Sequence, residues 1–329
     1  GAMNEAPALE LRPKNWMKPA MKRLSVLLCA AALLSPLGGC RREPEFARVD
    51  AALAPLIPED AVAIACLRLD RIKKTRFHEQ FIEKRKLPQL ERFAEQTGLD
   101  VRKDIWELLV AMRPAPAPPL ALIRGKFGGA FGLEPEFKQP GLQRMSYKGY
   151  YIVYGDGPGV LFLNTGAAAA GRIEDLKALV DRRDQKDWKT NRALLDLAGT
   201  LPGTSPFWMA ATRGGELLPR IPEDGPLGGA ARLTRTLGQM TVHSSLDNGL
   251  AVTVRGGYPD DATARQAAQA LRGLLGLARL RTPAQDADML RVLDGIRVTE
   301  RQTEVEINAE VASDLIEKFL ALLPGQAAE

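Results

Sequence analysis

The pattern that most constrains the fold is a hairpin signal in residues 239–256. Two runs of alternating apolar side chains, 239–246 and 250–256, surround Asn248-Gly249. Asn-Gly is a preferred dipeptide in hairpin turns because both residues tolerate a positive φ. An alternation with a period of two indicates a strand with one face turned toward a core. The chain is therefore predicted to contain an antiparallel sheet.

Similar patterns extend this prediction over residues 56–329. Runs of strand length occupy 61–69, 120–124, 144–147, 150–154, 160–164, 206–212, 296–300 and 303–309. The apolar segment 104–112 is interpreted as a helix that turns into a strand. Amphipathic helix patterns stand at 75–86, 88–98, 172–183, 227–237, 260–280, 286–293 and 313–323. Such a mixture is typical of an α+β fold with helices packed on one face of an antiparallel sheet. The similar order of elements in 56–200 and 201–329 suggests the hypothesis of two tandem, duplicated units.

A leader-like segment precedes this region. Met21-Lys22-Arg23 is positively charged, residues 24–34 are apolar, and the sequence SPLGGC follows at 35–40. A charged start, an apolar run of roughly 7–15 residues and small residues before a cleavage point are typical of a secretory signal. A membrane-spanning helix needs about 20 apolar residues. We therefore expect residues 21–39 to be a signal peptide that is removed.

The ending Leu37-Gly38-Gly39-Cys40 resembles the lipobox of bacterial lipoproteins. In that family a diacylglyceryl group is attached to the cysteine sulfur, the leader is cut before this residue, and the new amino group is usually acylated. The resemblance implies that Cys40 carries the lipid, with palmitate-type chains. It also implies a location in the cell envelope, facing the periplasm or the cell surface. Two or three acyl chains on one residue give stable anchoring. The alternative is an ordinary secretory signal with a chance cysteine.

Two segments flank the signal peptide. Residues 1–20 have no role in this scheme, and we interpret them as an upstream extension or a tag. Residues 40–55 begin as a charged stretch and then become rich in alanine. They are predicted to form a tether that lifts the folded part off the lipid surface.

The folded part resembles uncharacterised bacterial envelope proteins of the DUF3352-like kind. The resemblance rests on Gly98-Leu99-Asp100 with Asp104-Ile105, and on Ala170-Gly171 ahead of a predicted helix. It covers approximately residues 57–200. That group implies no defined activity, ligand or site residue.

The sequence contains few residues suited to nucleophilic or metal chemistry. Its cysteines are Cys29, Cys40 and Cys66, and its histidines are His78 and His243. Once the leader is removed and Cys40 is modified, Cys66 has no disulfide partner, so we expect a small buried apolar side chain. Two histidines cannot form a multi-histidine metal site, and no cofactor is expected. This pattern favours a protein without catalysis, although carboxylates brought together by folding could still serve a hydrolase.

Nucleotide and nucleic-acid binding are not supported. The sequence GAAAAG at 166–171 has the glycine spacing of a phosphate-binding loop, but Arg172-Ile173 replace the required Lys and Ser or Thr. We interpret it as a tight turn between a strand and a helix. Removing residues 1–39, which hold five basic and two acidic residues, lowers the formal charge from +5 to +2. A charge this small leaves no basic surface for nucleic acid.

The candidate binding residues are four tyrosines near a predicted hairpin turn. Tyr147, Tyr150, Tyr151 and Tyr154 surround Lys148. Tyrosines gather at binding surfaces, but strands also prefer them. The leading hypothesis is a lipid-anchored interaction or scaffold module with an envelope protein partner. The alternative is a binding protein for a hydrophobic or glycan ligand, held in a pocket between the two units.

Overall fold

The structure is a computed structural model that describes residues 46–83, 91, 100–127, 141–183, 185, 189–218 and 228–321. The predicted signal peptide, the lipobox-like residues Leu37, Gly38 and Gly39, and the predicted lipid-attachment residue Cys40 lie outside the described residues. The same is true of Gly98 and Leu99 and of the helix predicted at 88–98 except for Glu91.

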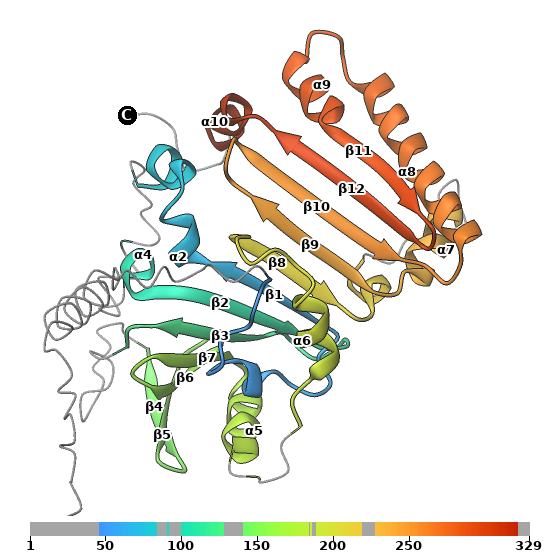
Figure 1. Cartoon of the computed structure of the whole chain (residues 1–329). Coiled ribbons are helices and arrows are strands. Elements are labelled where there is room, and N and C mark those ends of the chain that lie inside the picture. The colour runs from blue at the N-terminus through green and yellow to red at the C-terminus, as the bar shows by residue number, and fades with distance from the viewer. Residues whose placement is uncertain are drawn as a thin grey trace, which may run out of the picture. The chain divides into compact units, whose positions relative to one another are not determined.

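The described residues form one antiparallel sheet of twelve strands (Figure 1). The strands are β1 Ala63–Arg68, β2 Ile105–Met112, β3 Leu120–Gly125, β4 Gln143–Tyr147, β5 Tyr150–Tyr154, β6 Gly159–Asn164, β7 Ala167–Gly171, β8 Phe207–Ala211, β9 Met240–Ser245, β10 Leu250–Gly257, β11 Ile296–Arg301 and β12 Glu304–Val311. Their order in the sheet is β11-β12-β10-β9-β8-β1-β2-β3-β7-β6-β5-β4. The predicted α+β class with an antiparallel sheet is confirmed.

Helical segments connect and cover these strands. They are η1 Ala54–Leu56, α2 Leu69–Ile72, η2 His78–Ile82, α4 Val101–Asp104, α5 Ile173–Arg183, α6 Arg192–Ala198, η4 Gly214–Leu217, α7 Gly228–Thr236, α8 Asp261–Arg281, α9 Ala287–Asp294 and α10 Ser313–Ala321. The long α8 begins at Asp260, whose carboxylate accepts a hydrogen bond from the backbone N–H of Thr263 at 2.7 Å. This side chain satisfies one of the free N–H groups of the first turn.

The predicted hairpin in residues 239–256 is confirmed as β9 and β10. Val242 lies directly opposite Val254, and Ser245 lies opposite Ala251. The loop between the strands spans residues 246–249, and Gly249 has a φ of 122°. A glycine adopts this conformation without the steric cost that a side chain would bring.

The two halves of the chain are joined through their first strands. β8 pairs with β1, so the strand order reads β1-β2-β3-β7-β6 in one direction and β8-β9-β10-β12-β11 in the other. Residues 44–329 form one compact unit. The halves 56–200 and 201–329 are therefore parts of one continuous sheet rather than separate bodies. Their origin by duplication stays a prediction.

The helices of the two halves cover opposite faces of this sheet. Ile64 lies opposite Ala210 and faces a core covered by η1, α5 and α6. Its neighbour Ala63 points the other way and lies opposite Ala211, which in turn pairs with Met240 on the face covered by α7 and α8. Opposed residues of paired strands share a face, so these registers follow the faces through the sheet. The prediction that helices pack on one face of the sheet is correct within each half. Across the whole sheet, however, helices cover both faces.

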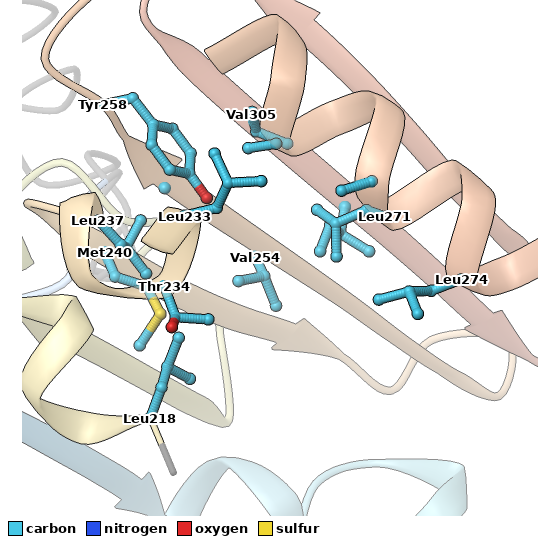
Figure 2. Close-up of a pocket in the computed structure, with 14 residues that line it drawn as sticks. Leu218, Leu233, Thr234, Leu237, Met240, Val254, Tyr258, Leu271, Leu274 and Val305 are labelled. Carbon is cyan, nitrogen blue, oxygen red and sulfur yellow. The ribbon is translucent and has the colours of Figure 1, made fainter. Parts of the chain in front are cut away.

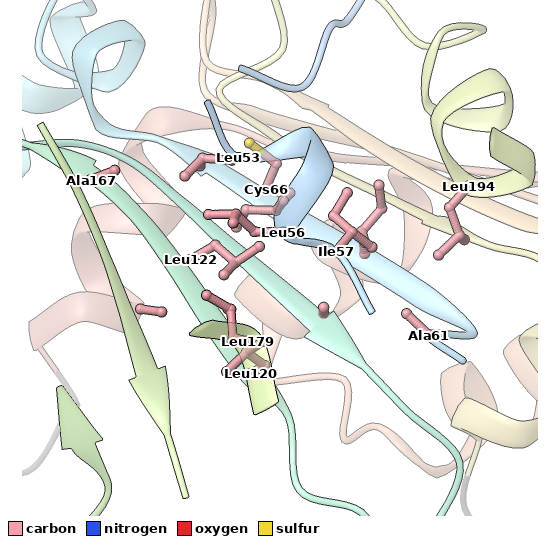
Figure 3. Close-up of a cluster of buried hydrophobic side chains, with 14 of the residues drawn as sticks. Leu53, Leu56, Ile57, Ala61, Cys66, Leu120, Leu122, Ala167, Leu179 and Leu194 are labelled. Carbon is pink, nitrogen blue, oxygen red and sulfur yellow. The ribbon is translucent and has the colours of Figure 1, made fainter. Parts of the chain in front are cut away.

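The segment after the described start of the chain is part of the main core. Ala47, Leu53 and Leu56 are buried, and the backbone N–H of Ala47 donates to the carbonyl of Leu201 at 2.7 Å. Figure 3 shows Leu53 and Leu56 directed toward the sheet beside Cys66. The tether predicted at 40–55 is therefore too long, because its apolar side chains are buried in the fold from residue 47 onward.

The sequence GAAAAG at 166–171 does not form the predicted turn. Ala167–Gly171 is strand β7, which pairs with β3 on one side and β6 on the other. Ala167 and Ala169 are small enough to lie beneath α5, where Leu176 and Leu179 are fully buried. Only the neighbouring strands select this conformation, because alanine by itself has a low preference for strands.

Replacing Gly249 by alanine is expected to lower the free energy of unfolding by about 1–3 kcal/mol. The φ of 122° disfavours a side chain, and a Cβ would meet the carbonyl oxygen of Val311. Gly273→Ala is the matched control, since a Cβ at this helical position meets nothing within 4 Å. There the same substitution should raise the free energy by about 0.5–1 kcal/mol. Urea unfolding of both variants measures the two changes in the free energy of unfolding. Changes of the same sign in both variants would contradict the hairpin geometry.

Candidate apolar ligand site

An apolar pocket lies between α7, α8 and the sheet of the second half (Figure 2). Its lining residues are Leu218, Leu233, Thr234, Leu237, Met240, Val254, Gly256, Tyr258, Ala267, Ala270, Leu271, Leu274, Val305 and Ile307. None of these is charged, and Thr234 and Tyr258 alone among them carry a polar side-chain atom. The cavity has a volume of approximately 270 Å³.

Strand alternation builds the floor of the pocket. Val254 and Gly256 of β10 point to the same face of the sheet, where they lie opposite Ile307 and Val305 of β12. Gly256 leaves room for the side chain of Leu237, whose Cδ1 would be 2.6 Å from a Cβ at that position. The floor is therefore apolar because each strand presents every second residue to it.

Helical spacing builds the opposite wall. Ala270 and Leu271 of α8 lie three and four positions after Ala267, and Leu274 lies three positions after Leu271, so the four share one face of the helix. The alanines lie over the sheet, and their short side chains leave space that larger residues would fill. The cavity results from this combination of a small-residue helix face and a flat apolar floor.

Burial changes along the pocket and shows where it opens. Ala267 is 2% exposed and Val305 is 3% exposed, whereas Leu274 is 42% exposed. The interior therefore lies near the first half of α8, and the mouth lies where Leu274 meets the solvent. Figure 2 shows Leu274 one helical turn beyond Leu271 on the same side of α8.

The two polar groups of the lining have different environments. The hydroxyl of Thr234 donates a hydrogen bond to the carbonyl of Ala231 at 2.8 Å. Tyr258 packs against the buried cluster of Ala264, Ala267, Ala268 and Val305, and burial raises the pKa of its hydroxyl above the usual value. Figure 2 shows this hydroxyl directed toward the other lining side chains. The pocket can therefore hold an apolar group, and its lining contains no acid–base or nucleophilic pair.

The location of this pocket differs from the sequence expectation. A pocket between the units 56–200 and 201–329 was predicted, but every lining residue lies within 218–307. No local pattern indicated it, because the sheet floor and the helix wall come from separate stretches of chain. The closest sequence signal was the spacing of alanine and leucine in residues 260–280.

The four candidate tyrosines do not form one surface. Tyr147 lies directly opposite Tyr150, and both pack against the main core. The hydroxyl of Tyr147 donates to Asp181 of α5 at 2.9 Å. Along β5, Tyr154 shares the face of Tyr150, whereas Tyr151 points to the other face. Packing and a hydrogen bond thus hold Tyr147 in place, while binding by any of the four stays a prediction.

The cysteine and the histidine in the sheet have no reactive arrangement with their neighbours. Cys66 is fully buried, and its burial, with the nearby Glu107, raises the pKa of the thiol. His243 is half-buried in β9 opposite Trp208, and burial lowers its pKa. Ser244 points to the other face and donates to the carbonyl of Phe207 at 3.2 Å. Within the described residues, no group of three His, Cys, Asp or Glu side chains could hold a metal ion.

One carboxylate lies inside the main core. Glu107 is buried in β2, with Arg68 of β1 and Arg124 of β3 directly opposite it. Burial raises the pKa of Glu107, and the positive charge of Arg68 opposes this shift. The nearby carboxylate of Asp50 pairs with Arg124 at 3.2 Å. The ion pair between Asp50 and Arg124 links the start of the fold to the sheet, and these residues lie outside the apolar pocket.

The chain has few detectable similarities to known proteins. No family model matches it, and no curated protein matches it. Two crystal forms of a protein called TP0453 are similar in structure, with TM-scores of 0.49 and 0.45 and 10% identity. Each comparison covers 82% of this chain and 98% or 96% of the other. At this identity and TM-score, the likeness assigns no function to this chain. Every helix in the described ranges is too short or too polar to cross a membrane.

Cys66 is expected to react with a thiol reagent at least roughly 100-fold more slowly in the folded protein than in denaturant, because reaction requires opening of the core. The measurement uses a chain with Cys29 and Cys40 replaced by serine, and it follows the absorbance of a released aromatic thiolate. Ala262→Cys, at an exposed position of α8, is the control and should be labelled rapidly in the folded state. Equal rates at both positions would contradict the burial of Cys66.

Proposed function

We propose that this chain is a lipid-anchored, non-catalytic protein of the cell envelope that binds an apolar ligand in the pocket beside α8. The uncharged, leucine-rich lining of that pocket carries the proposal. Burial of apolar surface contributes about 0.8 kcal/mol for each methylene group. A charged group placed in the same cavity would lose its hydration without gaining a partner.

The envelope location rests on the lipobox-like sequence that ends at Cys40. Six residues lead from Cys40 to Phe46, where the described fold begins. Fully extended, they span about 20 Å. A lipid on Cys40 would therefore hold the folded part close to the membrane, and the ligand would be taken up near a lipid surface.

An interaction or scaffold role with an envelope protein partner is the second candidate. It is favoured by Leu277 and Leu280, which are 52% and 83% exposed on α8. Exposed apolar side chains that gather on one element are typical of contact surfaces. This role and ligand binding are compatible, because Leu277 and Leu280 lie outside the pocket lining.

Cys40→Ala is expected to move the protein from the membrane fraction to the soluble fraction, because the attachment atom is lost. The measurement is immunoblotting of both fractions after expression in a bacterium that processes lipoproteins. Cys66→Ala is the matched control, since it removes a buried cysteine and should leave the protein in the membrane fraction. Unchanged fractionation of Cys40→Ala would overturn the anchor.

Ala270→Phe is expected to lower the affinity for an uncharged naphthylamine dye at least about tenfold, because the new ring occupies the cavity. The dye fluoresces in apolar surroundings, and its titration gives the dissociation constant. Ala262→Phe introduces the same side chain at an exposed position of α8 and should leave the affinity unchanged. Absence of dye binding to the unmodified pocket would refute the proposed ligand binding.

A further inference from the structure

We infer that the ligand is an amphiphile with a single unbranched acyl chain. The acyl chain of the ligand lies in the pocket, and its polar head group stays at the mouth beside Leu274. This inference rests on the proposed function and names the ligand class of the same site. Three features of the described residues carry it: the size of the cavity, the absence of a partner for a head group, and the continuation of the apolar surface along α8.

The size of the cavity suits one chain. Its volume of approximately 270 Å³ is near the lower end of the range for ligand pockets, which starts at about 300 Å³. The two chains of a diacyl lipid need more space than this. The walls include five leucines and Met240, and these side chains adapt to a flexible ligand by changing rotamer. Tyr258 is the sole aromatic residue in the lining, so there is no pair of flat walls for a fused-ring ligand.

The interior offers no site for a polar head group. The hydroxyl of Thr234 already donates to Ala231, and the hydroxyl of Tyr258 is the remaining polar side-chain atom of the lining. A carboxylate or phosphate needs several hydrogen bonds or a cation when it leaves water. The head group must therefore remain where solvent reaches, which is the side of Leu274.

The apolar surface continues beyond the mouth. Leu274, Leu277 and Leu280 follow one another at intervals of three residues, and their exposed fractions rise from 42% to 52% to 83%. Side chains three positions apart are neighbours on a helix surface. An acyl chain that is longer than the pocket can cover Leu277 with the part that extends out of the mouth. The same arrangement gives an acyl chain an apolar path from a nearby lipid surface into the pocket.

The test is displacement of the naphthylamine dye by saturated fatty acids of increasing length, from about six to about sixteen carbons. The protein is the full chain carrying Cys40→Ala, so that no attached acyl chain competes for the pocket. All ligands are kept below the concentration at which they form micelles. Affinity is expected to rise about fourfold for each added methylene until the pocket is filled, and then to level off. Fatty alcohols of equal length should bind within about fivefold of the acids, because the head group is exposed.

Two variants and one control show where the acyl chain binds. Ala270→Phe should lower the affinity for every fatty acid at least about tenfold, while Ala262→Phe should leave the series unchanged. Leu271→Ala enlarges the cavity, and its affinity series should level off at a longer chain. Circular dichroism and thermal unfolding establish that each variant is folded. If Ala270→Phe does not fold, the shift in Leu271→Ala decides the result.

The outcomes separate this inference from the proposed function. If the dye binds in the pocket but affinity does not depend on chain length, the acyl-chain inference is wrong and apolar ligand binding stands. If a neutral fused-ring compound displaces the dye more strongly than any fatty acid does, the acyl-chain inference is also wrong and apolar ligand binding stands. If the dye does not bind at all, both the inference and the proposed ligand binding are refuted.

Discussion

The pairing of β1 with β8 is the contact on which the rest of the structure depends. It joins two stretches of chain that lie more than 130 residues apart, from Ala63 opposite Ala211 to Leu67 opposite Phe207. Both strands lie in the middle of the sheet, so their other edges pair with β2 and β9. A strand paired on both edges exposes no free backbone groups, which makes this junction a stable centre.

The same junction sets two separate cores on opposite faces. Trp208 and Ala210 contribute to the core under η1, α5 and α6, whereas Ala211 contributes to the core on the side of α7 and α8. The change of covered face happens at β8, where buried residues point in both directions. As a result, the pocket beside α8 is built independently of the segment that leads toward Cys40. A ligand can therefore occupy the pocket without displacing Leu53 and Leu56 from the other core.

The polar groups of the fold have structural partners rather than a common cleft. Glu107 lies between two arginines, Tyr147 donates to Asp181, and Ser244 donates to a backbone carbonyl. The cavity beside α8 has an apolar lining, so its chemistry is burial rather than reaction. A single turn of α8 connects this cavity to exposed leucines, so that binding and surface contact share one helix.

The sequence by itself determined the features that depend on neighbouring residues. The alternation around Asn248-Gly249 predicted β9 and β10, and the spacing of apolar residues predicted α5 and α8. The lipid anchor at Cys40 stays a prediction from the sequence. Only the tertiary structure decided that Ala167–Gly171 is a strand, which face each helix covers, and that a cavity forms beside α8. The reason is physical. An apolar pattern with a period of two shows that side chains alternate, but the partner strand decides which side is buried. A cavity exists only where residues from distant segments fail to fill the space between them.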